Sequence, residues 1–145
     1  MMRKVDPIGE DFEVIGKKTS LVIIDMNYVE CHPDYGLGLK LREMKGVNTE
    51  YYFDRVENLV IPNLQKLTDV CRKNNTKVVY SVVGYENSDM SDLVKPPRNP
   101  RLGLGKSTPG NKEFEVRKEV KPHKDDVVVT KPCSGFFAGT NIDQN

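Results

Sequence analysis

Three short runs of hydrophobic residues have the length and composition of strands buried in a parallel sheet. They occupy residues 21–25, 77–83 and 126–131, and their apolar positions do not alternate with polar ones. A strand covered on both faces has this continuous character, whereas a strand with one wet face alternates. The three runs therefore predict three strands of one parallel sheet.

Between the first two runs, residues 54–74 carry apolar side chains at the three- and four-residue spacing of an amphipathic helix. Asp54 and Glu57 have the spacing of a capping box, and basic residues lie near the predicted end, where they complement the helix dipole. Pro62 leaves two alternatives open, a kink in the helix or a continuous part that begins at Pro62. Strand, helix and strand in this order predict a right-handed βαβ unit.

The other segments have the composition of loops. Residues 1–20 are mixed and polar, which predicts an extended lead-in, and residues 26–46 are predicted to form a loop because they contain several turn-forming residues. Residues 84–110 hold four prolines and are long for a structureless loop, which is typical of an active-site cover. Alternating apolar and charged residues at 112–121 predict a short exposed strand or turn.

Composition and charge fit one ordinary soluble domain. The chain has 145 residues, and its 22 Lys and Arg against 21 Asp and Glu give a net charge of +1, which provides no reason to expect nucleic acid or a membrane surface as partner. No apolar run approaches the roughly 20 residues of a membrane helix, so we expect a cytoplasmic protein. Three widely spaced cysteines, Cys31, Cys71 and Cys133, indicate reduced thiols rather than a disulfide framework or a zinc ribbon.

Two charged residues, Asp25 and Lys131, stand at the ends of the first and third predicted strands. Because the carboxyl ends of parallel strands meet at one edge of a sheet, where ligands bind, an acid and a base from distant positions are expected to share one pocket. A lysine stabilises an ionised aspartate, and such a pair can orient and deprotonate a nucleophile. The alternatives are that Asp25 caps the next turn through the amide of Asn27 or Tyr28, and that Lys131 extends to solvent.

Other candidate motifs are weak. Gly105-Lys106-Ser107 is similar to the end of a phosphate-binding loop, but Pro100 occupies the position of the required glycine and no strand precedes it. His32 and His123 lie far apart without a shared spacing, which predicts surface histidines rather than a metal site.

The residues around Asp25 and Lys131 carry a family resemblance. Residues 21–27 read Leu-Val-Ile-Ile-Asp-Met-Asn, and residues 129–140 read Val-Thr-Lys-Pro-Cys-Ser-Gly-Phe-Phe-Ala-Gly-Thr. Together with residues 67–72 and 77–80, they resemble the isochorismatase-like cysteine hydrolases, in which hydrophobics-Asp-Met-Gln/Asn opens the first strand and Lys-x5-Phe-x-Gly-Thr follows the third. The match covers most of residues 20–143 in order and spacing.

This resemblance implies an α/β fold, a three-layer Rossmann-like parallel sheet with helices on both faces. It makes Asp25 the general base and Lys131 the second member of an Asp-Lys-Cys triad, and it places Phe137 in the Phe-x-Gly-Thr motif. The nucleophilic cysteine of the family lies on a later turn, beyond Asn145. We therefore expect residues 1–145 to be a single domain that lacks its carboxyl-terminal part and is inactive alone. Cys133 falls on a variable position and is the alternative nucleophile.

The implied activity is hydrolysis of a C–N bond in a small amide, ureido or carbamoyl compound. Family members that act on nicotinamide hold zinc through an Asp-His-His cluster, and residues 83–110 contain no histidine, so no metal and no cofactor are expected. Two alternatives remain: an isochorismatase-type vinyl-ether hydrolase and a non-catalytic relative that binds a partner.

Residues of the two loops that follow the first two strands are expected to wall the pocket and contact the substrate. The candidate substrate-binding residues are Tyr28, Tyr35, Tyr85, Arg98 and Phe137. Because an incomplete sheet leaves a strand unpaired, we also expect a missing carboxyl-terminal segment or a second chain as partner, and a homo-oligomer.

Overall fold

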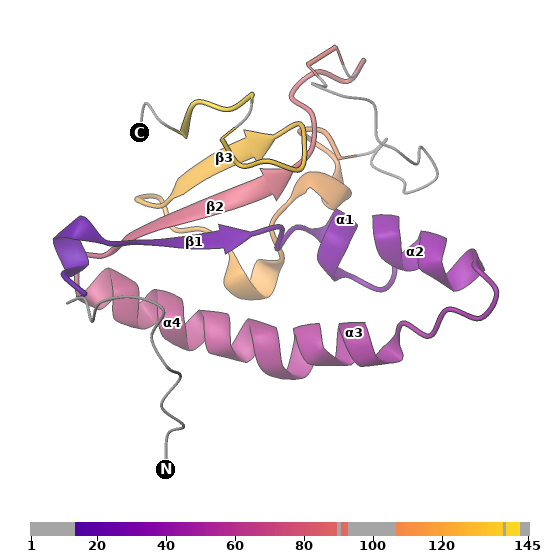
Figure 1. Ribbon diagram of the computed structural model, residues 1–145, viewed down its shortest axis with the longest axis horizontal. Helices are drawn as coiled ribbons and strands as arrows, with labels where there is room; N and C mark the ends of the chain where they lie inside the picture. Colours follow the sequence, from indigo (N-terminus) through magenta and orange to yellow (C-terminus); the bar gives the residue numbers. More distant parts are fainter. Residues whose placement is uncertain (1–13, 90, 93–106, 138, 143–145) are drawn as a thin grey trace, which may run out of the picture.

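A three-stranded parallel sheet forms the centre of the molecule in the computed structural model (Figure 1), which describes residues 14–89, 91–92, 107–137 and 139–142. The strands β1 (Ser20–Ile24), β2 (Lys77–Val83) and β3 (Val127–Lys131) lie in the order β1-β2-β3, and both pairings are parallel. The α/β fold and the three predicted strands are therefore confirmed, with the first strand displaced by one residue and the third beginning one residue later than predicted.

Short and long helices connect and flank the strands. In chain order they are the 3-10 helix η1 (Gly16–Lys18), α1 (Tyr28–Cys31), α2 (Gly36–Glu43), α3 (Glu50–Arg55), the π-helical turn η2 (Val56–Val60), α4 (Ile61–Lys73), and the 3-10 helices η5 (Lys112–Phe114) and η6 (Lys118–Val120). No helix in this described part of the chain is long and apolar enough to cross a membrane.

The predicted helix between the first two strands is confirmed, but its start and its cap are wrong. The helical stretch begins at Glu50, after Thr49, and the Asp54 carboxylate accepts a hydrogen bond from the Asn58 amide instead of capping a terminus. The turn η2 then widens the helix directly before α4. Pro62 lies in the first turn of α4, directly after this π-helical turn, so the helical stretch neither begins nor ends at the proline.

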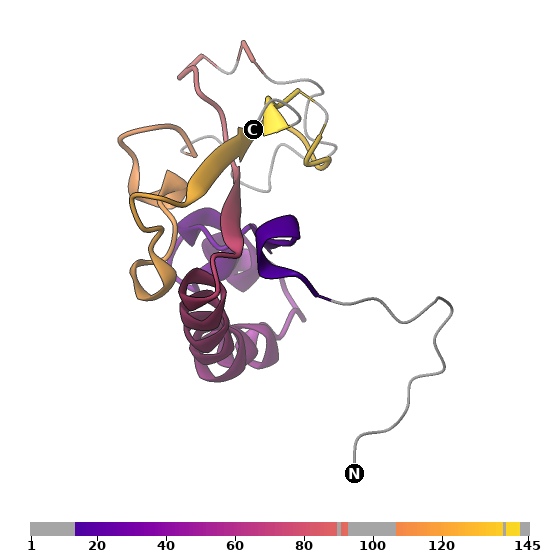
Figure 2. The same ribbon diagram turned by 90° about the vertical axis from the view of Figure 1, so that its left-hand side faces the viewer.

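The helix α4 and the turn η2 cover one face of the sheet (Figure 2). The core between them contains side chains of all these elements, including Ile23, Val78, Tyr80, Val56 and Ile61. Each of these side chains is at most 4% exposed. This packing accounts for the helical periodicity of the sequence, because the apolar stripe of the helix meets alternate residues of the strands.

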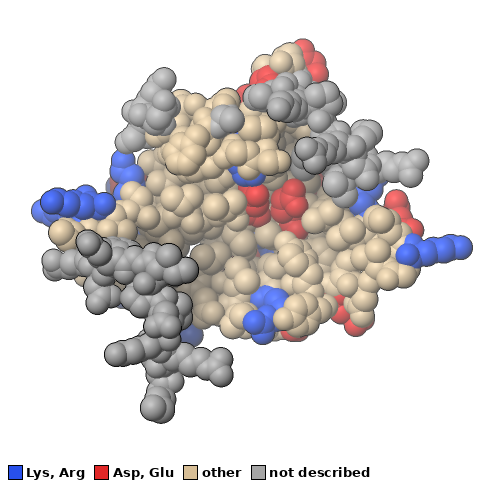
Figure 3. All heavy atoms as spheres, in the orientation of Figure 1, with Lys and Arg blue, Asp and Glu red and all other residues tan. Residues whose placement is uncertain are grey.

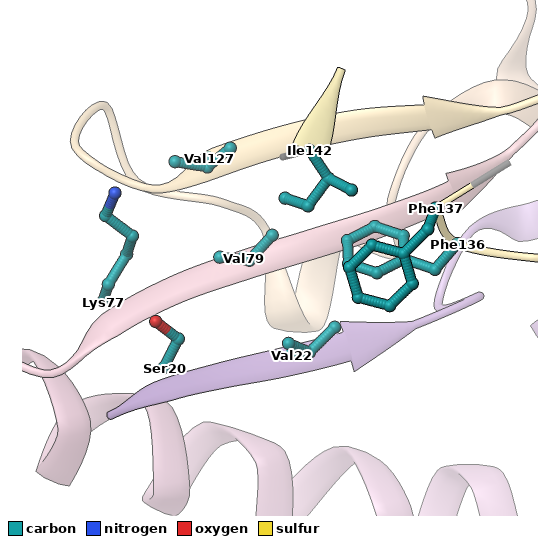
Figure 4. Close-up of a pocket in the computed structure, with 8 residues that line it drawn as sticks. All are labelled: Ser20, Val22, Lys77, Val79, Val127, Phe136, Phe137 and Ile142. Carbon is teal, nitrogen blue, oxygen red and sulfur yellow. The ribbon is translucent and has the colours of Figure 1, made fainter. Parts of the chain in front are cut away.

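The opposite face of the sheet carries an apolar groove of about 230 Å3 (Figure 4). Val22, Val79 and Val127 from the three strands lie beneath a segment that contributes Phe136, Phe137 and Ile142. Coverage of this face by the described residues is partial, since Val22 is 40% exposed and Phe137 is 75% exposed. The sequence predicts helices on both faces of the sheet. On this face, the described part of the chain has the segment with Phe136, Phe137 and Ile142 instead of a helix.

One predicted loop and one predicted strand or turn prove to contain helices. Residues 26–46, predicted as a loop, form α1 and α2. Gly36 begins α2 at a positive φ of 35°, and a Cβ there would lie 2.4 Å from Val29, so the glycine that indicated a turn is needed for close packing. Residues 112–121 were predicted to be exposed, yet Arg117 and Val120 are buried. The alternation of this segment reflects contact with residues 26–31 rather than a solvated edge.

Candidate active site

Asp25 occupies a sharp turn at the end of β1. Its amide donates to the Ser81 carbonyl of β2 at 2.9 Å, which extends the sheet ladder by one residue. Its φ of 57° then bends the chain away from the sheet. Aspartate is among the few residues that adopt this left-handed conformation readily, since its short polar side chain tolerates it. The strand therefore delivers the carboxylate to the carboxyl edge of the sheet.

Lys131, the last residue of β3, reaches the Asp25 carboxylate. Its Nζ lies 3.0 Å from Asp25 Oδ2, and the two side chains are 5% and 33% exposed, respectively. Because β2 lies between β1 and β3, the long lysine side chain spans the end of the middle strand. The contact expected from the two strand ends is confirmed, and the alternative that Lys131 extends to solvent is wrong.

The second oxygen of the Asp25 carboxylate, Oδ1, differs from Oδ2 in its contacts. Asp25 Oδ1 is buried and has no hydrogen-bond partner among the described residues. The Tyr28 amide, one of the donors considered for a cap, instead donates to the Glu115 carbonyl at 2.9 Å. An unpaired buried oxygen costs free energy, so its presence beside a paired one indicates a functional position rather than a stabilising cap.

A strap of residues 115–117 holds the turn that follows Asp25. It pairs antiparallel with residues 26–28 through the Arg117 amide, which donates to the Met26 carbonyl at 2.8 Å, and through the bridge between Asn27 and Val116. The fully buried Asn27 side chain also donates to the Val83 carbonyl at the end of β2, at 2.9 Å. The turn is thus fixed to both the strap and the sheet.

The buried guanidinium of Arg117 also holds the turn that follows Asp25 in place. Its side chain is 3% exposed, and it donates to the Cys31 carbonyl at 2.6 Å, to Glu57 at 2.7 Å and to Glu119 at 3.1 Å. These partners belong to α1, to the π-helical turn η2 and to the 3-10 helix η6. A buried arginine needs such complete pairing, and here the pairing joins three segments behind the site.

The thiol closest to Asp25 is that of Cys31. Its Sγ lies 3.0 Å from the backbone oxygen of Asp25 and 3.9 Å from the Tyr52 hydroxyl. Burial raises the pKa of this thiol to about 11, although the Tyr52 hydroxyl acts in the opposite direction. Cys31 therefore remains protonated near neutral pH and holds the Asp25 carbonyl, which does not suit a nucleophile.

Glu30 is a third charged group of this region, and the sequence analysis did not single it out. Burial raises the pKa of its carboxyl, the negative charge of Asp25 raises it further, and Lys131 acts in the opposite direction. The carboxylate thus lies within electrostatic reach of both members of the pair. Acidic and basic side chains are adjacent in the middle of the face drawn in Figure 3.

The other candidate substrate-binding residues do not gather around the pair. Tyr28 and Tyr35 pack edge to face, with ring centroids 5.3 Å apart, in a separate hollow. Tyr85 is 2% exposed, and Phe137 lies at the apolar groove on the sheet face. Arg98 lies outside the described residues. Contact of these residues with substrate stays a prediction.

The remaining cysteines make other contacts. Cys133 Sγ is 3.4 Å from the Gly135 carbonyl oxygen, and Cys71 packs against the core beneath the sheet. Among the described residues, no three His, Cys, Asp or Glu side chains lie together as they would around a metal ion. Chemistry without a metal stays a prediction.

Comparison with known proteins identifies relatives for most of the chain. The family model for the isochorismatase domain matches residues 19–145. No curated protein matches the sequence.

Solved structures share the fold. A cysteine hydrolase from Pseudomonas syringae pv. phaseolicola 1448A is 21% identical, with a TM-score of 0.64 over 92% of this chain and 55% of its own. N-carbamoylsarcosine amidase from Thermoplasma acidophilum is 21% identical, with a TM-score of 0.52 over 87% and 58%. Nicotinamidase from Bacillus subtilis is 15% identical, with a TM-score of 0.52 over 88% and 62%. The chain thus spans little more than half the length of these relatives.

Proposed function

Because the chain belongs to the isochorismatase domain family, we propose that it supplies the aspartate and the lysine of a hydrolase that cleaves a C–N bond in a small amide, ureido or carbamoyl compound. The observation that carries this proposal is the Asp25–Lys131 ion pair at the carboxyl edge of the sheet, together with Asp25 Oδ1, for which the described part of the chain offers no hydrogen-bond partner. The fold shared with an N-carbamoylsarcosine amidase and a nicotinamidase supports the choice of amide-like substrates.

In the proposed reaction, Asp25 Oδ1 accepts the proton of a cysteine thiol. The sulfur attacks the carbonyl carbon of the substrate, and the C–N bond breaks as the departing nitrogen takes that proton. Water then cleaves the thioester, which releases the acid and restores the thiol. Lys131 holds Oδ2, so the carboxylate keeps its orientation and its negative charge is balanced in a partly dry site.

The proposal assigns the nucleophile to a cysteine outside this chain. Cys31 is protonated and occupied with the Asp25 carbonyl, and Cys133 contacts the Gly135 carbonyl. The attacking thiol would therefore come from a further segment or a second chain that faces Asp25 Oδ1. The limited coverage of the relatives, 55% to 62% of their lengths, is consistent with this assignment.

The test of this function is ammonia release from a panel of small amides and ureido compounds, including nicotinamide and N-carbamoylsarcosine. It is made with the whole protein, that is, residues 1–145 together with the segment or second chain that carries the nucleophile. We expect turnover of at least one compound, and we expect it to persist in Cys31→Ser and Cys133→Ser. Loss of turnover in Cys133→Ser alone would instead make Cys133 the nucleophile. A vinyl-ether hydrolase or a non-catalytic binding protein would release no ammonia from any compound.

A further inference from the structure

A second hollow of about 380 Å3 lies beside α1 and has a composition unlike that of the Asp25 site. Aromatic and charged side chains line it: Tyr28, His32, Asp34, Tyr35, Lys112, Lys118 and Glu119. Three of these are aromatic rings in mutual contact, with centroids 4.9 to 5.4 Å apart. The hollow is therefore a place where a flat ring can stack.

This hollow is separate from the Asp25–Lys131 pair, and neither residue lines it. Successive residues of a helix are about 100° apart, so Glu30 points away from Tyr28, which is two positions before it in α1. The contact between the Tyr28 and His32 rings places both on one side of α1. Glu30, on the other side, is within electrostatic reach of the pair.

The charges around the hollow favour an anion over a cation. The two carboxylates already have arginine partners: Asp34 pairs with Arg42 at 2.6 Å and Glu119 with Arg117 at 3.1 Å. Lys118 is exposed, and no carboxylate of the described residues lies within ion-pair distance of it. Its ammonium is thus available to a ligand.

An aromatic cluster can bind a cation on a ring face, but in this hollow two cationic side chains of the protein already lie near the Tyr28 ring. Lys112 Nζ lies 4.2 Å from the centroid of the Tyr28 ring, and the Arg117 guanidinium lies 5.4 Å from it. A cationic ligand would meet these charges and be repelled.

His32 adds a neutral donor at the rim. Burial lowers the pKa of its imidazole, and the nearby Arg117 charge lowers it further. Its Nδ1 accepts a hydrogen bond from the Asp34 amide at 3.0 Å, so the remaining proton of the neutral ring resides on Nε2. This N–H can donate to an acceptor in the hollow.

We propose that this hollow binds a small aromatic carboxylate, whose ring packs against Tyr35 and His32 and whose carboxylate pairs with Lys118. The single negative charge suits one available ammonium, whereas a doubly charged phosphate would also meet Asp34 and Glu119 at the rim. The site is independent of the proposed hydrolysis, since it requires neither Asp25 nor the nucleophile.

Titration of the protein with benzoate, followed by the 1H–15N NMR signals of Tyr35 and His32, tests the proposal. We expect saturable shifts at these residues, and an affinity about tenfold lower in Lys118→Met because one charge-assisted hydrogen bond is lost. The matched control Lys17→Met removes an exposed lysine of η1 and should bind benzoate as the unchanged protein does.

Two further probes separate the contributions of charge and ring. Benzamide, which has the same ring without the charge, should bind about tenfold more weakly than benzoate, and tetramethylammonium should not bind in the hollow. Equal binding of benzoate and benzamide, tighter binding of tetramethylammonium, an unchanged affinity in Lys118→Met, or no shift at Tyr35 and His32 at the highest soluble benzoate concentration would each overturn the proposal. A dispersed spectrum of each variant verifies that it is folded.

Discussion

Asp25 combines three features that rarely occur together in one residue. It has a left-handed backbone, an ion pair with the buried Lys131, and a buried oxygen that no described residue hydrogen-bonds. Each of these costs free energy in the absence of compensation, and the strap around Arg117 together with the Asn27 side chain holds the turn in place. The residue is therefore positioned at the expense of stability, which is typical of a functional group.

The two members of the pair should contribute unequally to stability. Asp25→Asn keeps the turn, since asparagine also adopts positive φ, but it leaves the Lys131 ammonium, 5% exposed, without its ion-pair partner. Lys131→Met leaves a carboxylate that is 33% exposed and can reach water. We expect losses of about 2–4 kcal/mol for Asp25→Asn and about 1–2 kcal/mol for Lys131→Met in the free energy of unfolding. Urea denaturation measures both, and the reverse order would contradict the geometry.

The sequence predicted the Asp25–Lys131 pair, but it did not predict the residues that surround the pair and hold it in place. Asp25 and Lys131 were identifiable because each follows an apolar run, and strand ends of a parallel sheet converge. Arg117 was not, because an arginine among charged residues indicates a solvated position, and its burial depends on partners that are distant in sequence. Glu30 was not predicted as part of the site because the segment that contains it was predicted to be a loop.

The elements α4 and β3 are joined by one ion pair at the amino edge of the sheet. Arg72, in the last turn of α4, pairs with Asp126, the residue before β3, and its guanidinium also lies 3.4 Å from the Tyr80 hydroxyl of β2. Burial alone would raise the pKa of Asp126, but the ion pair with Arg72 and the His123 amide outweigh it and hold the pKa below its usual value of 3.8.

This shift predicts a pH-dependent contribution to stability. Because the pKa of Asp126 is lower in the folded protein, its contribution is fully present above about pH 4 and is lost as the pH falls through the folded pKa. Asp126→Asn should lower the free energy of unfolding by about 1–2 kcal/mol at neutral pH, with a difference that shrinks below pH 4. Urea denaturation at several pH values measures it. The exposed neighbour Asp125→Asn serves as control, and a difference independent of pH would contradict the role of the ion pair.

The sequence predicted those helices and strands whose residue pattern follows from burial in the core. It did not predict the helices that depend on contacts between residues distant in sequence. The strands and α4 were predicted because their apolar residues face one core. The helices α1 and α2 were missed because Gly36 and Gly38 indicate turns, whereas these glycines permit close packing against Val29 and residues 32–33. A carboxylate oxygen of Glu113 accepts from the Gly36 amide at 3.1 Å and so caps α2 from a remote segment, which no local rule reveals.

Over the whole molecule, the second face of the sheet carries apolar side chains that the described residues leave exposed. Val22 is 40% exposed and Ile24 is 58% exposed on this face, next to Phe137. Exposure of such surface costs about 25 cal/mol per Å2, so we expect the chain to associate through it, with a second copy or another segment.

Size-exclusion chromatography with light scattering measures this association. We expect Val22→Thr and Ile24→Thr to weaken it, whereas Leu39→Thr, which changes an exposed leucine of α2, should leave it unchanged. A compact monomer of 16.5 kDa with cooperative unfolding would show that this face needs no partner.

In the proposed function, the Asp25 carboxylate, paired with Lys131, is the general base of an amide-hydrolysing site. The most direct test is kcat for ammonia release by the whole protein, compared between the unchanged protein and Asp25→Asn, with the exposed Lys124→Met as control. The loss of a general base predicts a decrease of about 10^2–10^4-fold in Asp25→Asn and no change in Lys124→Met. Full activity of folded Asp25→Asn would contradict the account.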